Sequence, residues 1–223
     1  MTSWNNYKRV RSLDYFFPSI PTNKRRKMEL DEVASFSITK EDIARTMSEL
    51  ISKEYSRVFG VSNNITILDG MACVGGNTIS FSNSNHFKKI IAIELDDIRF
   101  RMLAHNIHTV LNLNNVSICN ENILNLSNDS SNNVRFEILF LDPEWGGPEY
   151  KSHNCLRLRI SGTPIEDFCL TVFNQHKKLN MIALKLPLNY DCDMFESFEH
   201  STYGIKYKKH ILNKMMLVLL KRN

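Results

Sequence analysis

A series of short apolar runs, with spacers long enough for helices between them, is the feature that most constrains the fold of this chain. The runs are ITILD (65–69), KIIAIE (89–94), VSIC (116–119) and FEILFLD (136–142). Nearly continuous apolar strands that are joined by helical crossovers form parallel sheets with both faces buried. We therefore expect an α/β fold built on a mostly parallel sheet.

Two helices and a closing hairpin complete the expected fold. Residues 39–58 carry apolar side chains at helical spacing, and Thr39 with Asp42 resembles a capping box at the start of that helix. Residues 96–111 predict a crossover helix. After the apolar run 181–187, the last two runs, 204–212 and 214–221, adjoin at Asn213. This spacing predicts an antiparallel hairpin at the C-terminal end.

Charge divides the chain into an arm and a body. The net charge is +4, yet residues 1–27 carry +6, because their seven basic residues are opposed only by Asp14, and the remaining residues sum to −2. Basic residues interleaved with Trp4, Tyr7, Tyr15, Phe16 and Phe17 suit a polyanion with stackable bases. A solvated tail or a nuclear-localisation signal is the alternative. We expect a basic arm (1–27), a helical extension (28–60) and one main domain (61–223).

Several classes of protein do not fit the sequence. The apolar runs are far shorter than the roughly 18 to 20 residues that span a bilayer, and the N-terminus lacks the apolar segment of a secretory signal. The five cysteines include no C-x-x-C pair, and His105 and His108 have no further ligand at metal-site spacing. The expectation is an intracellular, monomeric protein with reduced thiols, no membrane contact and no metal.

The stretch ILDGMACVGGNTISF (67–81) predicts a strand, an acid, a turn of small residues and a helix that begins near Gly76 or Asn77. Glycines let the backbone approach a ligand, and the helix N-terminus supplies amide groups. Glu94, at the tip of the next strand, can accept hydrogen bonds from both hydroxyls of a ribose, and Glu121 can accept one from an adenine amine. The G-x-G-x-x-G pattern of dinucleotide sites is missing. S-adenosylmethionine, which has no phosphate, therefore fits better than NAD.

The fourth apolar run ends in Asp142-Pro143-Glu144-Trp145, a pattern similar to that of methyltransferases acting on exocyclic amines. Such an amine is a poor nucleophile because its lone pair is delocalised into the ring. Hydrogen bonds to the Asp142 carboxylate and the Pro143 carbonyl favour the attack geometry and the developing positive charge. Trp145 can stack on the base, and it binds a cationic base more strongly because the ring face is negative.

The chain resembles the RNA cap guanine-N2 methyltransferases, also called trimethylguanosine synthases. The family's W-G-G-P-[DE]-Y motif is matched by residues 145–150, its cofactor turn by residues 69–79, and its upstream segment by MELDEVASFSITKEDIA (28–44). The resemblance extends over residues 28–221. It implies a Rossmann-like class I S-adenosylmethionine-dependent methyltransferase domain whose substrate is a capped RNA, methylated once or twice on N2 of 7-methylguanosine.

The resemblance also implies a role for particular residues. The catalytic residues would be Asp142, Pro143 and Trp145. The cofactor would be held by Phe36, Asp69, Ala72, Gly75, Asn77, Thr78, Glu94 and Glu121. The cap would be held by Trp145, Gly146, Gly147, Pro148, Tyr150, Lys27, Lys185 and Asn189.

Two departures from the family pattern leave other functions open. Glu144 replaces the usual second proline, and Pro187-Leu188-Asn189 lacks the arginine that the family often places at the cap phosphates, a role for which Lys185 is the substitute. One alternative is an N6-adenine or other amino methyltransferase that acts on uncapped nucleic acid. The other is a catalytically inactive cap-binding module.

Overall fold

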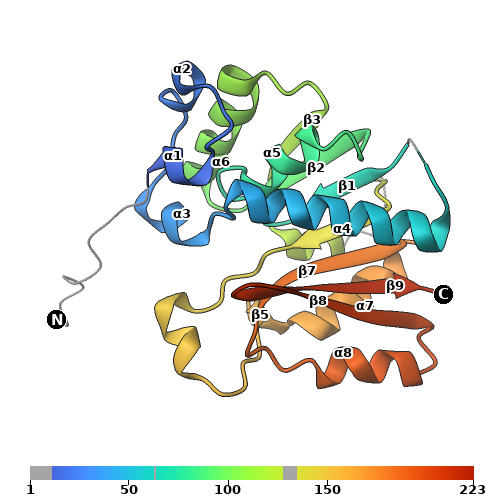
Figure 1. Cartoon of the computed structure of the whole chain (residues 1–223). Helices are drawn as coiled ribbons and strands as arrows, with labels where there is room; N and C mark the ends of the chain where they lie inside the picture. Colours follow the sequence, from blue (N-terminus) through green and yellow to red (C-terminus); the bar gives the residue numbers. More distant parts are fainter. Residues whose placement is uncertain (1–11, 63, 128–134) are drawn as a thin grey trace.

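A seven-stranded sheet runs through the centre of the protein in the computed structural model, which describes residues 12–62, 64–127 and 135–223 (Figure 1). The strand order is β3-β2-β1-β4-β7-β9-β8. The first five strands in this order are parallel, and β9 and β8 close the sheet as an antiparallel hairpin. The strands are β1 (Thr66–Asp69), β2 (Lys89–Glu94), β3 (Val116–Asn120), β4 (Ile138–Leu141), β7 (Met181–Pro187), β8 (Ile205–Leu212) and β9 (Met215–Arg222).

The sheet separates two hydrophobic cores, because alternate residues of each strand point to opposite faces. In β1, Ile67 packs into one core and Leu68 into the other. Each face is covered by helices, so both sides of the central strands are buried. The apolar runs therefore form the mostly parallel sheet and the closing hairpin that the sequence predicts.

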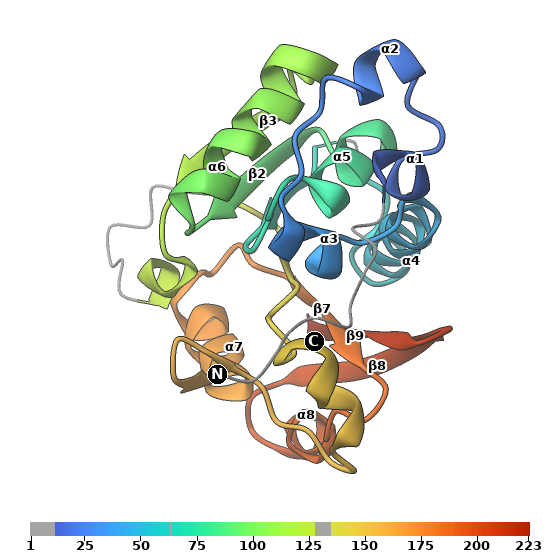
Figure 2. The same ribbon diagram turned by 90° about the vertical axis from the view of Figure 1, so that its left-hand side faces the viewer.

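Helices lie over both faces of the sheet (Figures 1 and 2). The first face carries α4 (Glu41–Phe59), α5 (Gly76–Asn83) and α6 (Asp97–Ala104), which continues as the π-helix η1 (His105–Leu111). The second carries α7 (Ile165–Gln175) and α8 (Asp193–Ser197), with the 3-10 turns η2 (Ile123–Ser127) and η4 (Phe198–His200). A ribbon of β5 (Arg159–Ile160) and β6 (Thr163–Pro164) precedes α7. None of the helices in the described ranges has both the length and the apolar character of a membrane span.

The capping box predicted at the start of one helix is wrong, and the crossover helix predicted over 96–111 forms but changes its geometry along its length. The helix expected from residue 39 has Lys40 as its N-cap with no side-chain cap bond, so Thr39 and Asp42 do not form a capping box. The Asp42 carboxylate instead accepts from the Lys40 ammonium and the Ile43 amide. The helix expected over 96–111 changes at His105 into the wider π-helix, a geometry that helical periodicity does not distinguish from an α-helix.

The described part of the N-terminal arm packs against the main domain. It forms the short helices α1 (Leu13–Phe16) and α2 (Thr22–Arg25), followed by α3 (Glu32–Ser37) in the extension. Phe16 and Phe17 are buried in the core, so these two rings are not free to stack on bases as the arm interpretation expects. The Arg25 guanidinium donates to the carbonyls of Phe17, Pro18 and Ile20. This part of the arm is therefore structural, while residues 1–11, with Trp4, Tyr7, Lys8, Arg9 and Arg11, lie outside the described residues.

A buried asparagine ties the N-terminal segment to the rest of the fold. The Asn106 carboxamide accepts from the Glu29 amide (2.8 Å) and donates to the carbonyls of Glu29 (2.9 Å) and Val74 (3.1 Å). The side chain is fully buried in the π-helix. It therefore connects residue 29 with the turn that precedes α5.

We predict that Asn106→Ala lowers the free energy of unfolding by about 2 to 4 kcal/mol, because buried backbone groups lose their partners and each unsatisfied group costs roughly 1 to 3 kcal/mol. Urea unfolding with an unchanged m-value measures the loss. Asn114→Ala, at an exposed position in a turn, is the control. Equal stability of the two variants would show that Asn106 does not fasten the segment.

Candidate active site

The site lies at the edge where the carboxyl ends of the parallel strands meet. Strand β1 ends with Asp69, β2 ends with Glu94, and Asp142 directly follows β4. In open α/β sheets, ligands bind in the crevice beyond these strand ends. The predicted cradle and the predicted catalytic tripeptide therefore lie at the same edge.

The turn between β1 and α5 is the cradle that the sequence predicts. Gly75 is the N-cap of α5 and has a left-handed backbone with φ of +106°, which favours glycine. At Gly76 a Cβ atom would lie 2.7 Å from Ile38 Cγ1 and 3.2 Å from the Thr39 carbonyl oxygen. The absence of side chains at these positions lets the segment before α4 lie against the cradle.

Asp69 forms the floor of the cradle and is fully buried. Its Oδ2 accepts a hydrogen bond from the Thr78 hydroxyl (2.6 Å), whereas its Oδ1 has no partner within the described residues. Burial raises the pKa of Asp69 to about 7, the Thr78 bond opposes this, and the nearby carboxylates of Asp142 and Glu94 add to it. Burial therefore favours the protonated form of this carboxyl.

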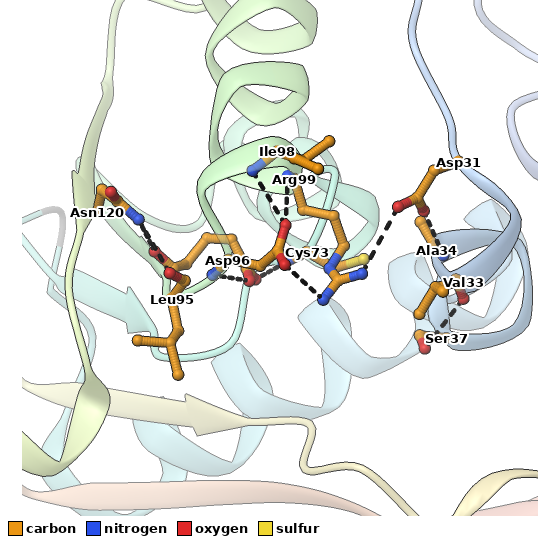
Figure 3. Close-up of polar contacts among 11 residues, drawn as sticks. Asp31, Val33, Ala34, Ser37, Cys73, Leu95, Asp96, Ile98, Arg99 and Asn120 are labelled. Carbon is orange, nitrogen blue, oxygen red and sulfur yellow. Dashed lines mark hydrogen bonds and ion pairs between the residues drawn. The ribbon is translucent and has the colours of Figure 1, made fainter.

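Glu94 fixes the cradle to β2. Its carboxylate accepts from the amides of Cys73 (2.8 Å) and Asp96 (2.9 Å). Each carboxylate oxygen has a second lone pair, so Glu94 can also accept from a ligand hydroxyl. On β3, the Asn120 amide donates to the carbonyls of Glu94 and Leu95 (Figure 3).

An arginine that the sequence does not single out joins the rim of this site to the N-terminal segment. The Arg99 guanidinium lies 3.3 Å from the Asp96 carboxylate and 3.5 Å from that of Asp31, the N-cap of α3 (Figure 3). Phe36, on the same short helix, has a side chain that is 59% exposed. Arg99 thus holds α3, the element that carries Phe36, beside the cradle.

Asp142 lies at the centre of the site, and three side chains approach its Oδ2. The Lys185 ammonium is 2.7 Å away, and the Thr39 hydroxyl and the Asn77 amide are each 3.5 Å away. Burial raises the pKa of Asp142, and the positive charge of Lys185 is the largest opposing influence. The ammonium is therefore paired with Asp142, and the contact of Lys185 with the cap phosphates that the sequence suggests stays a prediction.

Trp145 stands beside this ion pair. Its ring centroid is 5.4 Å from the Lys185 ammonium and 5.1 Å from the Tyr150 ring, which meets it edge-on at 78°. The indole Nε1 is buried and has no hydrogen-bond partner in the described part of the chain. Gly146 and Gly147 both have positive φ (+87° and +68°) and open space where a side chain would be. The motif therefore leaves room for a flat ligand next to the indole.

Asn189 holds the loop that carries this motif. Its side-chain amide donates to the carbonyls of Tyr150 (2.7 Å) and His153 (2.8 Å), and its main-chain carbonyl accepts from the Leu156 amide (2.8 Å). Tyr150 belongs to the 3-10 turn η3 (Gly147–Ser152). Asn189, expected from the sequence at the cap, thus fastens the motif loop to the end of β7.

The remaining predicted residues lie at different places. Pro143 and Ala72 are buried, and Glu144 is exposed. Glu121 lines a mainly apolar pocket with Ile91, Ile93, Cys119, Asn122, Asn125 and Leu126. The Lys27 carbonyl contacts the His105 ring on the π-helix, and the predicted contact of Lys27 with the cap stays a prediction. Sequence reasoning did not assign Thr39 or Arg99 to the site, because the sequence suggests a helix cap for Thr39 and no motif for Arg99, and each acquires its partner only through folding.

The chemistry of these side chains suits S-adenosylmethionine. The edge carries the carboxylates of Asp69, Glu94 and Asp142, which favour a sulfonium and an ammonium group and disfavour a pyrophosphate. Glu94 would hold the ribose, Glu121 would face the adenine, and the unpaired Oδ1 of Asp69 lies beneath the cradle. The residues present therefore fit this cofactor better than a dinucleotide.

Comparison with known proteins identifies the family of this chain. The family model described as RNA cap guanine-N2 methyltransferase matches residues 63–218. A trimethylguanosine synthase from Schizosaccharomyces pombe is 26% identical over 196 residues, which cover 82% of this chain and 71% of that protein. An uncharacterized protein of Acanthamoeba polyphaga mimivirus is 30% identical over 223 residues, covering 92% of this chain and 84% of the viral protein.

Solved structures show the same fold. A SAM-dependent methyltransferase from Agrobacterium tumefaciens is similar with a TM-score of 0.57 and 8% identity, covering 84% of this chain and 64% of that one. A precorrin-6y C5,15-methyltransferase from Geobacter metallireducens has a TM-score of 0.53 and 12% identity, covering 84% and 91%. At these identities the likeness is one of fold, and it confirms the expected Rossmann-like methyltransferase architecture.

We predict that Asp69→Asn stabilises the protein at pH 8 but not at pH 4. The pKa of Asp69 is raised from 3.8 to about 7 on folding, so between these values the folded state binds more protons than the unfolded state, and stability falls as pH rises. Three pKa units correspond to about 4 kcal/mol at most. Urea unfolding from pH 4 to pH 8 measures the difference between the variant and the unsubstituted chain.

The control is Asp97→Asn, which removes one exposed carboxylate from the first turn of α6. A difference between Asp69→Asn and the unsubstituted chain that stays constant over this pH range would contradict the assignment of a raised pKa to Asp69.

Proposed function

The chain belongs to the RNA cap guanine-N2 methyltransferase family, and on this premise we propose that it adds one or two methyl groups to N2 of the 7-methylguanosine cap of an RNA. Its fold is that of S-adenosylmethionine-dependent methyltransferases. The substrate, the number of methyl groups and the residues that act are parts of the proposal. Capped RNA is the partner, and the protein acts as a monomer.

The observation that carries the proposal is the proximity of Asp142 and Trp145 at one strand tip. Lys185 contacts both, at 2.7 Å from Asp142 Oδ2 and 5.4 Å from the Trp145 ring centroid. A base stacked on the indole would present its exocyclic amine near the carboxylate. The 7-methylguanine ring is cationic, which suits an indole face and an acidic edge.

The transfer follows from this arrangement. S-adenosylmethionine, when bound, would supply a methyl group on a positively charged sulfur. The N2 lone pair would form the new C–N bond as the C–S bond breaks, and the bonding pair would stay with the sulfur. Asp142 accepts a hydrogen bond from N2, which favours attack and the positive charge that develops there. After attack, N2 loses one proton to the carboxylate, which passes it to water. The Pro143 carbonyl accepts a hydrogen bond from the other N–H of the amine.

The cap phosphates and the RNA chain are held by other groups. Residues 1–11 carry Lys8, Arg9 and Arg11, which suit phosphates. Leu188 stands where the family often has an arginine, so we assign phosphate contact to lysine and arginine residues elsewhere. One relative is viral, and a cytoplasmic viral site of action is therefore as compatible with the proposal as a nucleus.

We predict that the protein transfers labelled methyl groups to m7GTP and not to GTP, because the cationic ring is the recognition element. Mass spectrometry of the product gives the number of methyl groups. Equal labelling of both nucleotides, or labelling of uncapped adenine-containing oligonucleotides, would favour the general amino methyltransferase instead. Cap binding without transfer would favour an inactive binding module.

A substitution in the site gives this test its control. Trp145→Ala should lower kcat/KM by roughly 5- to 150-fold, since base stacking is worth about 1 to 3 kcal/mol, while affinity for S-adenosylhomocysteine stays the same. Tyr203→Ala, on an exposed ring beside η4, is the matched aromatic control. A weaker cofactor affinity in Trp145→Ala would mean that the indole supports the fold rather than the base.

We also predict that replacing Lys8, Arg9 and Arg11 by glutamine weakens binding of a capped oligonucleotide but not of m7GTP. The dependence of affinity on salt should become shallower, by about 0.7 to 0.9 in slope for each phosphate that the variant no longer neutralises. Deleting residues 1–27 is not equivalent, because it removes Phe16 and Phe17 from the core. An unchanged salt slope would identify the arm as a tail or a localisation signal.

A further inference from the structure

A lysine lies buried in the middle of the catalytic edge. Lys185 is in β7, and its residue is only 5% exposed. Its ammonium contacts the Asp142 carboxylate at 2.7 Å and lies 3.5 Å from the Ser37 carbonyl. A buried charge is unfavourable unless it is paired. Asp142 is therefore the partner that makes a lysine acceptable at this position.

The sheet register explains why these two side chains meet. Leu141 and Leu184 are paired neighbours in the parallel strands β4 and β7. The next residues along are Asp142 and Lys185, which therefore lie side by side and point to the same face. That face also receives Thr39, from the segment before α4, and Asn77 of α5.

The contacts of Asp142 are unequal for its two oxygens. Lys185, Thr39 and Asn77 all approach Oδ2. Over the described ranges of the chain, no side chain or amide contacts Oδ1 within hydrogen-bond distance. One oxygen is therefore held by the protein, and the other is left as an acceptor for a ligand.

We propose that Lys185 is a positioning residue for methyl transfer: it holds Asp142 ionised and in one orientation, with Oδ2 bound to the ammonium and Oδ1 directed to the exocyclic amine. The proposal rests on the proposed function. It also gives Lys185 a role other than phosphate binding.

The charges around Asp142 make this lysine necessary. The charged and titratable groups that interact with Asp142 include Lys185 from β7, Asp69 from β1 and Cys73 from the cradle. Burial raises the pKa of Asp142, and Lys185 opposes that rise. Without the ammonium, a buried carboxyl next to Asp69 would take up a proton. A protonated carboxyl offers an O–H donor where the amine needs an acceptor.

The ammonium also contributes to the position of Trp145. A cation about 5 Å from an indole centroid is attracted to the ring, and here the distance is 5.4 Å. Lys185 thus links the group that would accept the amine to the ring on which the base would stack. Removal of the Lys185 ammonium should lower kcat more than it weakens cofactor binding, because the role proposed for Lys185 involves Asp142 and Trp145 and not the cradle turn.

The test compares Lys185→Gln, which removes the charge but keeps a hydrogen-bond donor, with Lys185→Arg, which keeps the charge. The pH profile of kcat/KM for m7GTP should have an acid limb on which the value falls about tenfold per pH unit. In Lys185→Gln this limb should lie at higher pH than in the unsubstituted protein. At high pH the activity should recover, because Asp142 ionises again. Lys185→Arg should restore the original limb.

The matched control is Lys221→Gln in β9. Lys221 is also a buried lysine paired with a buried carboxylate, at 2.6 Å from Glu54. It pairs with Met181, the first residue of β7, and therefore lies at the end of the sheet away from the catalytic edge. It should lose stability like Lys185→Gln but keep the original acid limb. Thermal unfolding checks that each variant is folded, and Lys185→Met replaces Lys185→Gln if the latter does not fold.

A second readout does not need catalysis. The carboxyl ¹³C signal of Asp142, identified by its disappearance in Asp142→Asn, should titrate at higher pH in Lys185→Gln than in Lys185→Arg. If the unsubstituted protein transfers no methyl group to m7GTP, the proposed function fails, yet this titration still tests the role of Lys185. An acid limb and a carboxyl titration that do not move in Lys185→Gln would overturn the proposal and leave Lys185 as a packing residue.

Discussion

The ion pair between Asp142 and Lys185 is the interaction on which the candidate active site depends. It forms because β4 and β7 are parallel neighbours in a fixed register, which sets the two side chains together on one face. Both groups are nearly buried, and a buried charge is costly unless it is paired. The pair also brings together Thr39, Asn77 and Trp145, which belong to three separate parts of the chain.

The second constraint is the accumulation of acids at this edge. Asp69, Glu94 and Asp142 stand at the ends of three adjacent strands, and burial, together with the two neighbouring carboxylates, raises the pKa of Asp69 to about 7. A site of this charge is suited to a positively charged cofactor and a cationic base. Family membership and site electrostatics therefore support the same chemistry from independent observations.

The N-terminal segment is part of this site rather than an appendage. Asn106 holds residue 29, Arg99 holds Asp31, and Gly76 lets residues 38 and 39 approach the cradle. Through these contacts, helix α3 with Phe36 and the residue Thr39 reach the strand tips. Contacts of the described residues therefore cross the boundary between the helical extension and the main domain that the sequence suggests.

The sequence by itself determined the strands, their mostly parallel arrangement and the motif residues at their tips, because apolar runs and short motifs are local patterns. It did not determine that Lys185 pairs with Asp142, or that Asn189 holds the motif loop. It also did not determine that Thr39 contacts Asp142 instead of capping a helix, or that a π-helix begins at His105. These features depend on which residues distant in the chain become neighbours. Only the tertiary structure supplies that information, because strand register and the docking of the N-terminal segment decide which charges and hydrogen-bonding groups are buried together.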